Sequence, residues 1–275
     1  MHDALLRNRL LRTEEPYSNT EFYGVLSEYY QGILDHTGCV LSRAYGFKQA
    51  HILDILPGGA DFLVGLGQRL DNLYLTAFEL SARPRDNMLQ KLSYFDMEDR
   101  VNFLLMDETS NQWEIPSVSE SFDGVTCFNR LNLVTDPLAL LLEIRRVLKT
   151  GGLLILTNVN ILSLGWLHSA HNWLKLRQPQ SRKQFAAGAV RAISYQTMRS
   201  ILSRNGFKIV NYSGLGSPRA MYYRVLVQVF SQFGNTDNRL RYEYRYASSF
   251  WEPSPFWSYF ANVNFIIATK EKQDG

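Results

Sequence analysis

The spacing of apolar residues alternates along the chain between the period of a buried strand and the period of a helix. Short apolar runs, typical of strands buried on both faces of a parallel sheet, occur at 51–56, 73–80, 101–106, 122–128, 153–157, 207–212 and 264–269. Helical spacing appears between them at about 60–70, after Pro84 and at 194–204. Strands that alternate with helices predict an α/β fold with a doubly wound sheet of seven strands.

Two further helices carry boundary signals. Ser18 and Glu21 form a capping box before an apolar stripe, and Gly38 follows it, which predicts a helix over 18–35. Asp136 suits an N-cap and Pro137 the first helical position. The leucines at 138, 141, 142 and 148 follow at helical spacing, and Gly151 is expected to end this helix.

No internal repeat and no linker rich in proline or serine divides the chain. We therefore expect an N-terminal helical segment at 1–50 and one domain at 51–275. Two segments of that domain, 158–193 and 213–261, are too long for ordinary connections and are interpreted as insertions.

The composition fits a globular protein with a substantial core, since 45% of the 275 residues are hydrophobic. The two cysteines, Cys39 and Cys127, cannot form a disulfide framework and are not spaced as metal ligands, which favours a reducing cytosol. The first fifteen residues lack the apolar core of a signal peptide. These features together predict a cytoplasmic protein.

Charge is distributed unevenly along the chain. Residues 1–143 hold 21 acidic and 11 basic side chains, whereas residues 144–236 hold 13 basic and no acidic ones. The acid-free stretch favours an anionic partner such as an anionic substrate, nucleic acid or an acidic membrane surface, and a solvated basic face is the alternative. Within it, Lys175, Arg177, Arg182 and Lys183 are the candidate contacts with an anionic membrane.

Polar and flexible residues occur where the predicted strands end, which is where ligands bind in doubly wound sheets. The first strand ends in Asp54-Ile55-Leu56-Pro57-Gly58-Gly59, and the two glycines allow a sharp turn or a close approach to a ligand. Glu79 ends the second strand, where a carboxylate can accept hydrogen bonds from a ribose or be solvated.

The third and fourth strands end in polar residues as well. Asp107 can accept the exocyclic amine of adenine or cap the following turn. Asn129 can bind a cofactor, the loop backbone, or both. Each of these strand-end signals is weak when taken alone.

In this order and spacing, the residues resemble the class I S-adenosylmethionine-dependent methyltransferases of the small-molecule branch, with their Rossmann-like sheet. The stretch SFDGVTCFNRLNLVTDPLALLLEIRRVLKTGGLLILT at 121–157 is most similar, and ISYQTMRSILSRNGFKIV at 193–210 resembles the helix and strand that follow. The likeness covers about two thirds of the chain and implies S-adenosylmethionine as the cofactor.

The resemblance also implies roles for individual residues. The methionine end of the cofactor would be lined by Asp54 and by the loop residues Leu56, Pro57, Gly58 and Gly59. Glu79, beside Leu80, would hold the ribose. Asp107, beside Glu108, would accept the adenine amine, and Asn129 would face the reacting methyl. The family's loop reads D-x-G-x-G-x-G, and here Leu56 and Ala60 replace the outer glycines. Leu56 is therefore expected to reshape the pocket.

The acceptor side offers two candidate catalytic residues. His168 and His171 are three apart in the 158–193 insertion, and either is a candidate general base for an acceptor that loses a proton. The alternative is that both are ordinary helix residues. No carboxylate lies nearby in sequence, so we predict no metal site.

The second insertion, 213–261, is rich in aromatic residues. It is interpreted as a lid, a binding surface or a membrane contact, with a small satellite core as the alternative.

The resulting hypothesis is a methyltransferase acting on a small-molecule, sugar or lipid-linked acceptor, with peripheral contact to an anionic membrane. A non-catalytic or scaffolding protein of the same fold is the first alternative. An RNA methyltransferase is the second and less favoured one, because the fourth strand is not followed by an Asn/Asp-Pro-Pro-aromatic motif.

Overall fold

The computed structural model describes most of the predicted domain. The described residues are 27–57, 59–107, 113–131, 134, 136–163, 192–216, 222–223, 226, 229–230, 251–252 and 255–272. The predicted capping box of Ser18 and Glu21 lies outside them.

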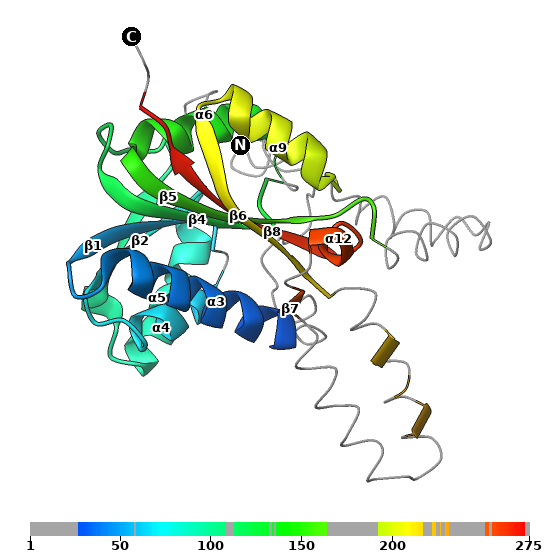
Figure 1. Cartoon of the computed structure of the whole chain (residues 1–275). Helices are drawn as coiled ribbons and strands as arrows, with labels where there is room; N and C mark the ends of the chain where they lie inside the picture. Colours follow the sequence, from blue (N-terminus) through cyan, green and yellow to red (C-terminus); the bar gives the residue numbers. More distant parts are fainter. Residues whose placement is uncertain are drawn as a thin grey trace, which may run out of the picture.

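A single mixed sheet organises the described residues (Figure 1). Its strands are β1 (Ala50–Ile55), β2 (Leu73–Glu79), β3 (Val101–Leu105), β4 (Phe122–Phe128), β5 (Leu148–Val159), β6 (Phe207–Leu215), β7 (Trp251–Glu252) and β8 (Val263–Lys270). They lie in the order β3-β2-β1-β4-β5-β8-β6-β7. The first five strands are parallel to one another, and β8 runs antiparallel between β5 and β6. The seven longer strands confirm the predicted seven-stranded doubly wound sheet, and β7 adds a two-residue edge.

Helices cover both faces of this sheet (Figure 1). One face carries α3 (Ser27–Tyr45), α4 (Asp61–Gly67) and α5 (Ala82–Tyr94), and the other carries α6 (Pro137–Val147) and α9 (Tyr195–Arg204). The short helices η1 (Glu98–Arg100) and α12 (Pro255–Ser258) lie in connections. The two faces bury separate apolar clusters, which are called here the α6 face and the α3 face.

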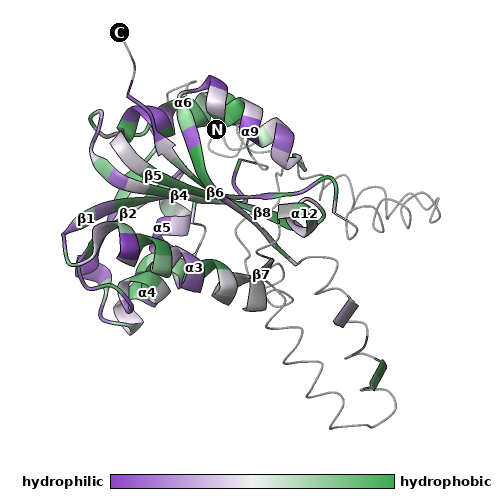
Figure 2. Cartoon of the chain, in the orientation of Figure 1, coloured by the Kyte–Doolittle hydropathy of each residue, from purple (hydrophilic) through white to green (hydrophobic). Residues whose placement is uncertain are grey.

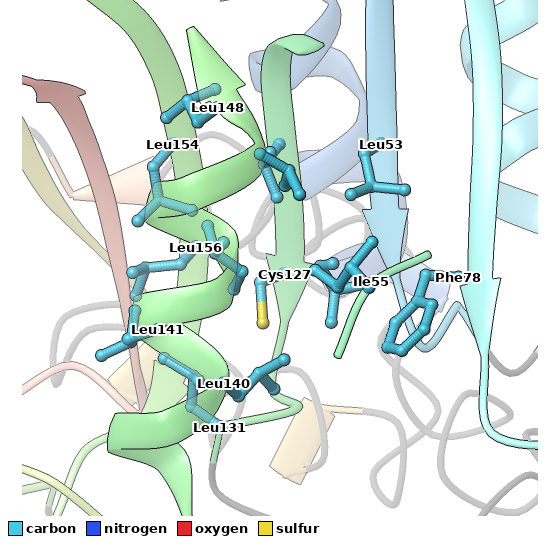
Figure 3. Packing of buried hydrophobic residues seen from close by; sticks show 14 of the residues in the cluster. Leu53, Ile55, Phe78, Cys127, Leu131, Leu140, Leu141, Leu148, Leu154 and Leu156 are labelled. Carbon is cyan, nitrogen blue, oxygen red and sulfur yellow. The ribbon is translucent and has the colours of Figure 1, made fainter. Parts of the chain in front are cut away.

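On the α6 face, apolar residues of helix α6 and of the strands pack into one buried cluster (Figure 3). Leu140 and Leu141 of α6 point toward Cys127 and Leu156 on the strands. Asp136 caps this helix as predicted, since its carboxylate accepts a 2.9 Å hydrogen bond from the Ala139 main-chain nitrogen. In the hydropathy view, hydrophilic and hydrophobic segments alternate along α3 and α9 (Figure 2).

Two predicted helix ends were wrong. The first helix does not stop at Gly38 but continues to Tyr45, because the buried stripe of Ile33, Leu34 and Leu41 spans Gly38 and packs in the α3-face cluster. A glycine inside a helix lowers its stability by only about 1 kcal/mol, which that burial outweighs.

The helix after Asp136 ends at Val147 rather than at Gly151. Leu148 already belongs to β5, and Gly151 has φ +79° within that strand. Of the leucines at helical spacing, Leu138 and Leu142 are about half exposed, whereas Leu140 and Ile144 of the same helix are buried.

The strand ends also fall later than predicted. β5 continues to Val159 and β6 to Leu215, so both predicted insertions begin inside strands. In the part of the chain that the structure describes, no helix is long and apolar enough to cross a membrane.

Candidate active site at the carboxyl ends of the strands

Asp54 lies near the end of β1 and is almost fully buried. Its carboxylate accepts a 2.8 Å hydrogen bond from the Thr126 hydroxyl on β4. Burial raises the pKa of Asp54 to about 7, although the Thr126 hydrogen bond and the charge of Arg130 act in the opposite direction. The site therefore contains a carboxyl group that gains or loses its proton near neutral pH.

The loop after β1 is held in place from β4. The Arg130 guanidinium, buried at the end of β4, donates a 2.8 Å hydrogen bond to the Pro57 carbonyl. Gly59 lies in the same loop, partly buried, whereas Gly58 lies outside the described residues. Neither Thr126 nor Arg130 was predicted as a site residue. Arg130 could have been recognised as a site residue from the sequence, because it directly follows the predicted fourth strand and is next to Asn129.

Leu56 adopts a backbone conformation that is rare for residues other than glycine. Its φ is +52°, in the left-handed region that glycine favours. Its side chain is 1% exposed and belongs to the α6-face core, with Phe78 and Leu131 among the members of that cluster. The leucine is thus a packing residue of the core as well as part of the loop.

Glu79 ends β2 as predicted and is fully buried. Asp54 pairs with Ala77 in the parallel ladder, and Glu79 lies two residues beyond Ala77, so both carboxylates project from the α3 face of the sheet. Leu80, the next residue, packs in the α6-face core instead. The structure therefore brings two buried carboxylates to the same edge from neighbouring strands.

Asn129 follows β4 with φ +57°, a conformation that asparagine tolerates better than most residues. Its main-chain nitrogen donates a 3.0 Å hydrogen bond to the Thr157 carbonyl on β5. Its side-chain Oδ1 is buried and has no hydrogen-bond partner among the described residues. Asn129 therefore presents an acceptor beside the Asp54 strand.

Asp107 lies just beyond β3 and is exposed. Met106 extends that strand, since its main-chain nitrogen donates a 2.9 Å hydrogen bond to the Glu79 carbonyl. Asp107 thus follows the strand beside Glu79, as an adenine contact would require. Its predicted neighbour Glu108 lies outside the described residues.

His168 and His171 also lie outside the described residues, but the two ends of their segment are placed. Where the chain comes back from this segment, the Ile193 main-chain nitrogen donates a 2.9 Å hydrogen bond to the Val159 carbonyl. Asn158 Nδ2 donates a 2.7 Å hydrogen bond to the Ile193 carbonyl. The segment therefore leaves and rejoins the domain at the carboxyl end of β5, on the edge that holds Asp54 and Glu79.

The described basic residues of the acid-free stretch lie mostly at the opposite edge. Lys149 forms an ion pair with Asp123 near the start of β4, and Arg146 pairs with Glu143. Lys208 lies at the start of β6. The four candidate contacts with an anionic membrane, Lys175, Arg177, Arg182 and Lys183, lie outside the described residues.

Comparison with known proteins agrees with this geometry. Residues 53–156 match the sequence profile of a family described as "Methyltransferase domain". A search of curated protein sequences finds no significant match.

Solved structures share the fold at low identity. A SAM-dependent methyltransferase from Thermotoga maritima is 17% identical, with 91% of this chain and 93% of that chain covered and a TM-score of 0.55. The [4+2]-cyclase SpnF is 17% identical over 86% of this chain and 80% of that chain, with a TM-score of 0.55. A phosphoethanolamine N-methyltransferase from Haemonchus contortus, in complex with S-adenosylhomocysteine, is 15% identical over 86% of this chain and 53% of that chain, with a TM-score of 0.51.

The sheet order and the strand-end site define a class I methyltransferase fold. Residues 53–156 therefore carry a methyltransferase domain on this fold, and S-adenosylmethionine is the cofactor that such domains use.

Proposed function

We propose that this chain transfers the methyl group of S-adenosylmethionine to a small-molecule, sugar or lipid-linked acceptor. The observation that carries the proposal is the pair of buried carboxylates, Asp54 and Glu79, at the carboxyl ends of adjacent parallel strands. A ligand with an ammonium group at one end and a ribose diol at the other fits both of them.

The residues fit this cofactor in four places. Asp54 and the main chain of the 56–59 loop would hold the methionine end, Glu79 the ribose, Asp107 the adenine amine, and Asn129 the region of the reacting methyl. Leu56, at the position of a glycine in the family's loop, has a left-handed backbone that glycine favours, and its side chain lies in the core. The fold therefore tolerates Leu56 in place of the family's glycine, because the leucine side chain packs in the core.

The bound cofactor supplies an electrophilic methyl group. The chain's own contribution is then to hold donor and acceptor in line and to exclude water. Where the acceptor is a hydroxyl, a base must take its proton, and His168 and His171 remain the proposed candidates. Substitution of the responsible histidine by glutamine should lower kcat while the affinity for S-adenosylhomocysteine stays unchanged.

The methyl-transfer activity is tested with S-adenosylmethionine labelled in its methyl group. The full-length protein is incubated with neutral sugars, with lipid alcohols and with short RNA, and the label is followed into each fraction. Label in the sugar or lipid fraction, reduced in Glu79→Gln, supports the proposal. Label in RNA alone favours the RNA methyltransferase.

The membrane contact is tested by co-sedimentation with anionic and with neutral vesicles at low and high salt. Each basic side chain near an anionic bilayer contributes about 1 kcal/mol, so four of them should give salt-sensitive binding. The variant with alanine at 175, 177, 182 and 183 should lose it. Equal sedimentation of this variant and the native protein would contradict the membrane contact and favour a soluble acceptor.

A second candidate function is compatible with the [4+2]-cyclase SpnF, which shares this fold but is named for a different reaction. It is the binding of S-adenosylmethionine without methyl transfer, which includes the scaffolding alternative. Cofactor binding together with no label transfer to any acceptor would support this candidate.

A further inference from the structure

Two pairs of exposed apolar residues lie at the carboxyl end of β5. Ile161 and Leu162, just beyond this strand, are 37% and 40% exposed, and Phe256 and Trp257 of α12 are 63% and 45% exposed. Figure 1 shows α12 beside the end of β5. These four residues are called here the apolar rim, and they lie at the same edge of the sheet as the candidate active site.

A buried asparagine joins the two halves of the apolar rim. Asn160 is fully buried, and its Nδ2 donates a 2.7 Å hydrogen bond to the carbonyl of Tyr259, the residue that follows α12. Its Oδ1 accepts a 3.1 Å hydrogen bond from the Leu162 main-chain nitrogen. The Tyr212 hydroxyl of β6 donates a 2.8 Å hydrogen bond to the Ser258 carbonyl of α12. These bonds satisfy main-chain groups from inside the protein, so the apolar side chains project from a fixed frame.

The sequence around the apolar rim is free of charge. Residues 150–174 and 253–269 contain no Asp, Glu, Lys or Arg. Lys149, just before the first range, and Lys270, just after the second, form ion pairs at the opposite edge of the sheet. Glu252, just before the second range, lies on the edge strand β7. Charged side chains are costly at the depth of lipid acyl chains, so a rim without them is suited to that depth.

A second pair of exposed aromatic residues has a different electrostatic setting. Tyr94 and Phe95, at the end of α5, are 82% and 38% exposed, with 5.0 Å between ring centroids. Three of the four residues 96–99, which follow them, are acidic. Phe256 and Trp257 make the same edge-to-face contact at 5.2 Å, without acidic residues after them up to Lys270. Negative charge therefore opposes contact with an anionic surface at the first pair and not at the apolar rim.

We propose that the apolar rim is a membrane anchor that inserts into the interface of an anionic bilayer. Apolar and aromatic side chains on one side, with basic residues beside them, are typical of interfacial membrane binding. The chain that continues from Leu162 contains no acidic residue before 237 and carries basic residues from Lys175 onward. The anchor deepens the proposed function and rests on it, because it would turn the candidate active site toward a bilayer that holds a lipid-linked acceptor.

The test is co-sedimentation of the full-length protein with vesicles of phosphatidylglycerol and phosphatidylcholine in equal parts, at low and at high salt. The native protein should keep part of its binding at high salt, because salt screens charges but not apolar contacts. The double variant Phe256→Ser, Trp257→Ser should lose this salt-resistant binding and bind about tenfold more weakly at low salt. The matched control is Tyr94→Ser, Phe95→Ser, which removes an equally exposed aromatic pair and should bind as the native protein does.

The two halves of the apolar rim are compared in the same assay. The double variant Ile161→Ser, Leu162→Ser changes the side that follows β5 and should weaken salt-resistant binding as well. Native binding that disappears entirely at high salt, or that persists unchanged in both rim variants, would overturn the anchor and leave the contact through the basic residues. A native dimer in light scattering that both rim variants convert to a monomer would assign the rim to a second copy of the chain and would also overturn the anchor.

Calorimetry with S-adenosylhomocysteine separates failure of the anchor from failure of the proposed function. All variants should bind it with the native affinity, because the altered residues lie outside the proposed cofactor site. A native protein that does not bind it would overturn the proposed function. Normal cofactor binding without salt-resistant vesicle binding would overturn the anchor alone.

Discussion

The Thr126 hydroxyl donates a 2.8 Å hydrogen bond to the Asp54 carboxylate, from the neighbouring parallel strand. This contact holds a carboxyl group in an almost fully buried position, where water cannot stabilise its charge. The protonation state of Asp54 therefore links the stability of the fold to the binding of a cation, and both consequences can be measured.

The first prediction concerns stability against pH. The pKa of Asp54 is raised from 3.8 to about 7 in the folded protein. The folded protein thus keeps a proton that the unfolded chain releases, so this stabilisation is complete below about pH 4 and is lost as the pH rises toward 7. Relative to native, Asp54→Asn should become more stable across this range, by at most about 4 kcal/mol. Denaturant titrations at several pH values should show this; a constant difference would contradict the buried, protonated carboxyl.

The second prediction concerns ligand affinity against pH. If the ammonium group of the ligand binds ionised Asp54, the affinity of the native protein for S-adenosylhomocysteine should rise about tenfold between pH 6 and pH 8. Calorimetry at both pH values measures it. Asp54→Asn is the control, with weak affinity that does not follow this titration. A rise of the same size in Asp54→Asn would assign the titration to another group.

The third prediction concerns Glu79. Glu79→Gln keeps the size of the side chain but removes the charge that would accept hydrogen bonds from the ribose diol. Charge-assisted hydrogen bonds contribute about 1.5–3 kcal/mol, so the affinity for S-adenosylhomocysteine should fall roughly ten- to hundredfold. Glu114→Gln, at an exposed carboxylate, is the control. Equal affinities of the two variants would remove Glu79 from the site.

The fourth prediction concerns the left-handed backbone at Leu56. Truncation of its buried side chain should destabilise the protein, but Leu56→Gly should be more stable than Leu56→Ala by about 1 kcal/mol, since only glycine accepts φ +52° without strain. At Leu63, buried within α4, the order should reverse. Thermal unfolding of the four variants measures this. A more stable alanine variant than glycine variant at both positions would contradict backbone strain at Leu56.

The strand runs and the Asp136 cap could be predicted because a buried parallel strand and a capped helix each leave a local pattern. The end of α3 could not, because Gly38 resembles a helix end locally and only the packing of Leu34 and Leu41 carries the helix past it. The positions of Asp54, Glu79 and Asn129 at the strand ends could be predicted in the same way. The contact of Thr126 with Asp54 and the hydrogen bond of Asn160 to Tyr259 depend on strand order and long-range packing, which no local pattern contains.

The fifth prediction tests the continuity of α3. Gly38 has no positive φ, and an added Cβ would lie 3.7 Å from the Arg69 side chain, an ordinary contact. Gly38→Ala should therefore raise the free energy of unfolding by about 0.5–1 kcal/mol. Gly46→Ala, at φ +57°, is the matched control and should lower it. Destabilisation by Gly38→Ala would show that the helix ends there after all.

The central claim is that the carboxyl ends of β1, β2 and β4 form an S-adenosylmethionine site. Isothermal titration of the full-length protein with S-adenosylhomocysteine tests it most directly. We expect one molecule to bind per chain, with affinity reduced at least tenfold in both Asp54→Asn and Glu79→Gln at pH 8. No binding by the native protein, or native affinity in both variants, would contradict the claim.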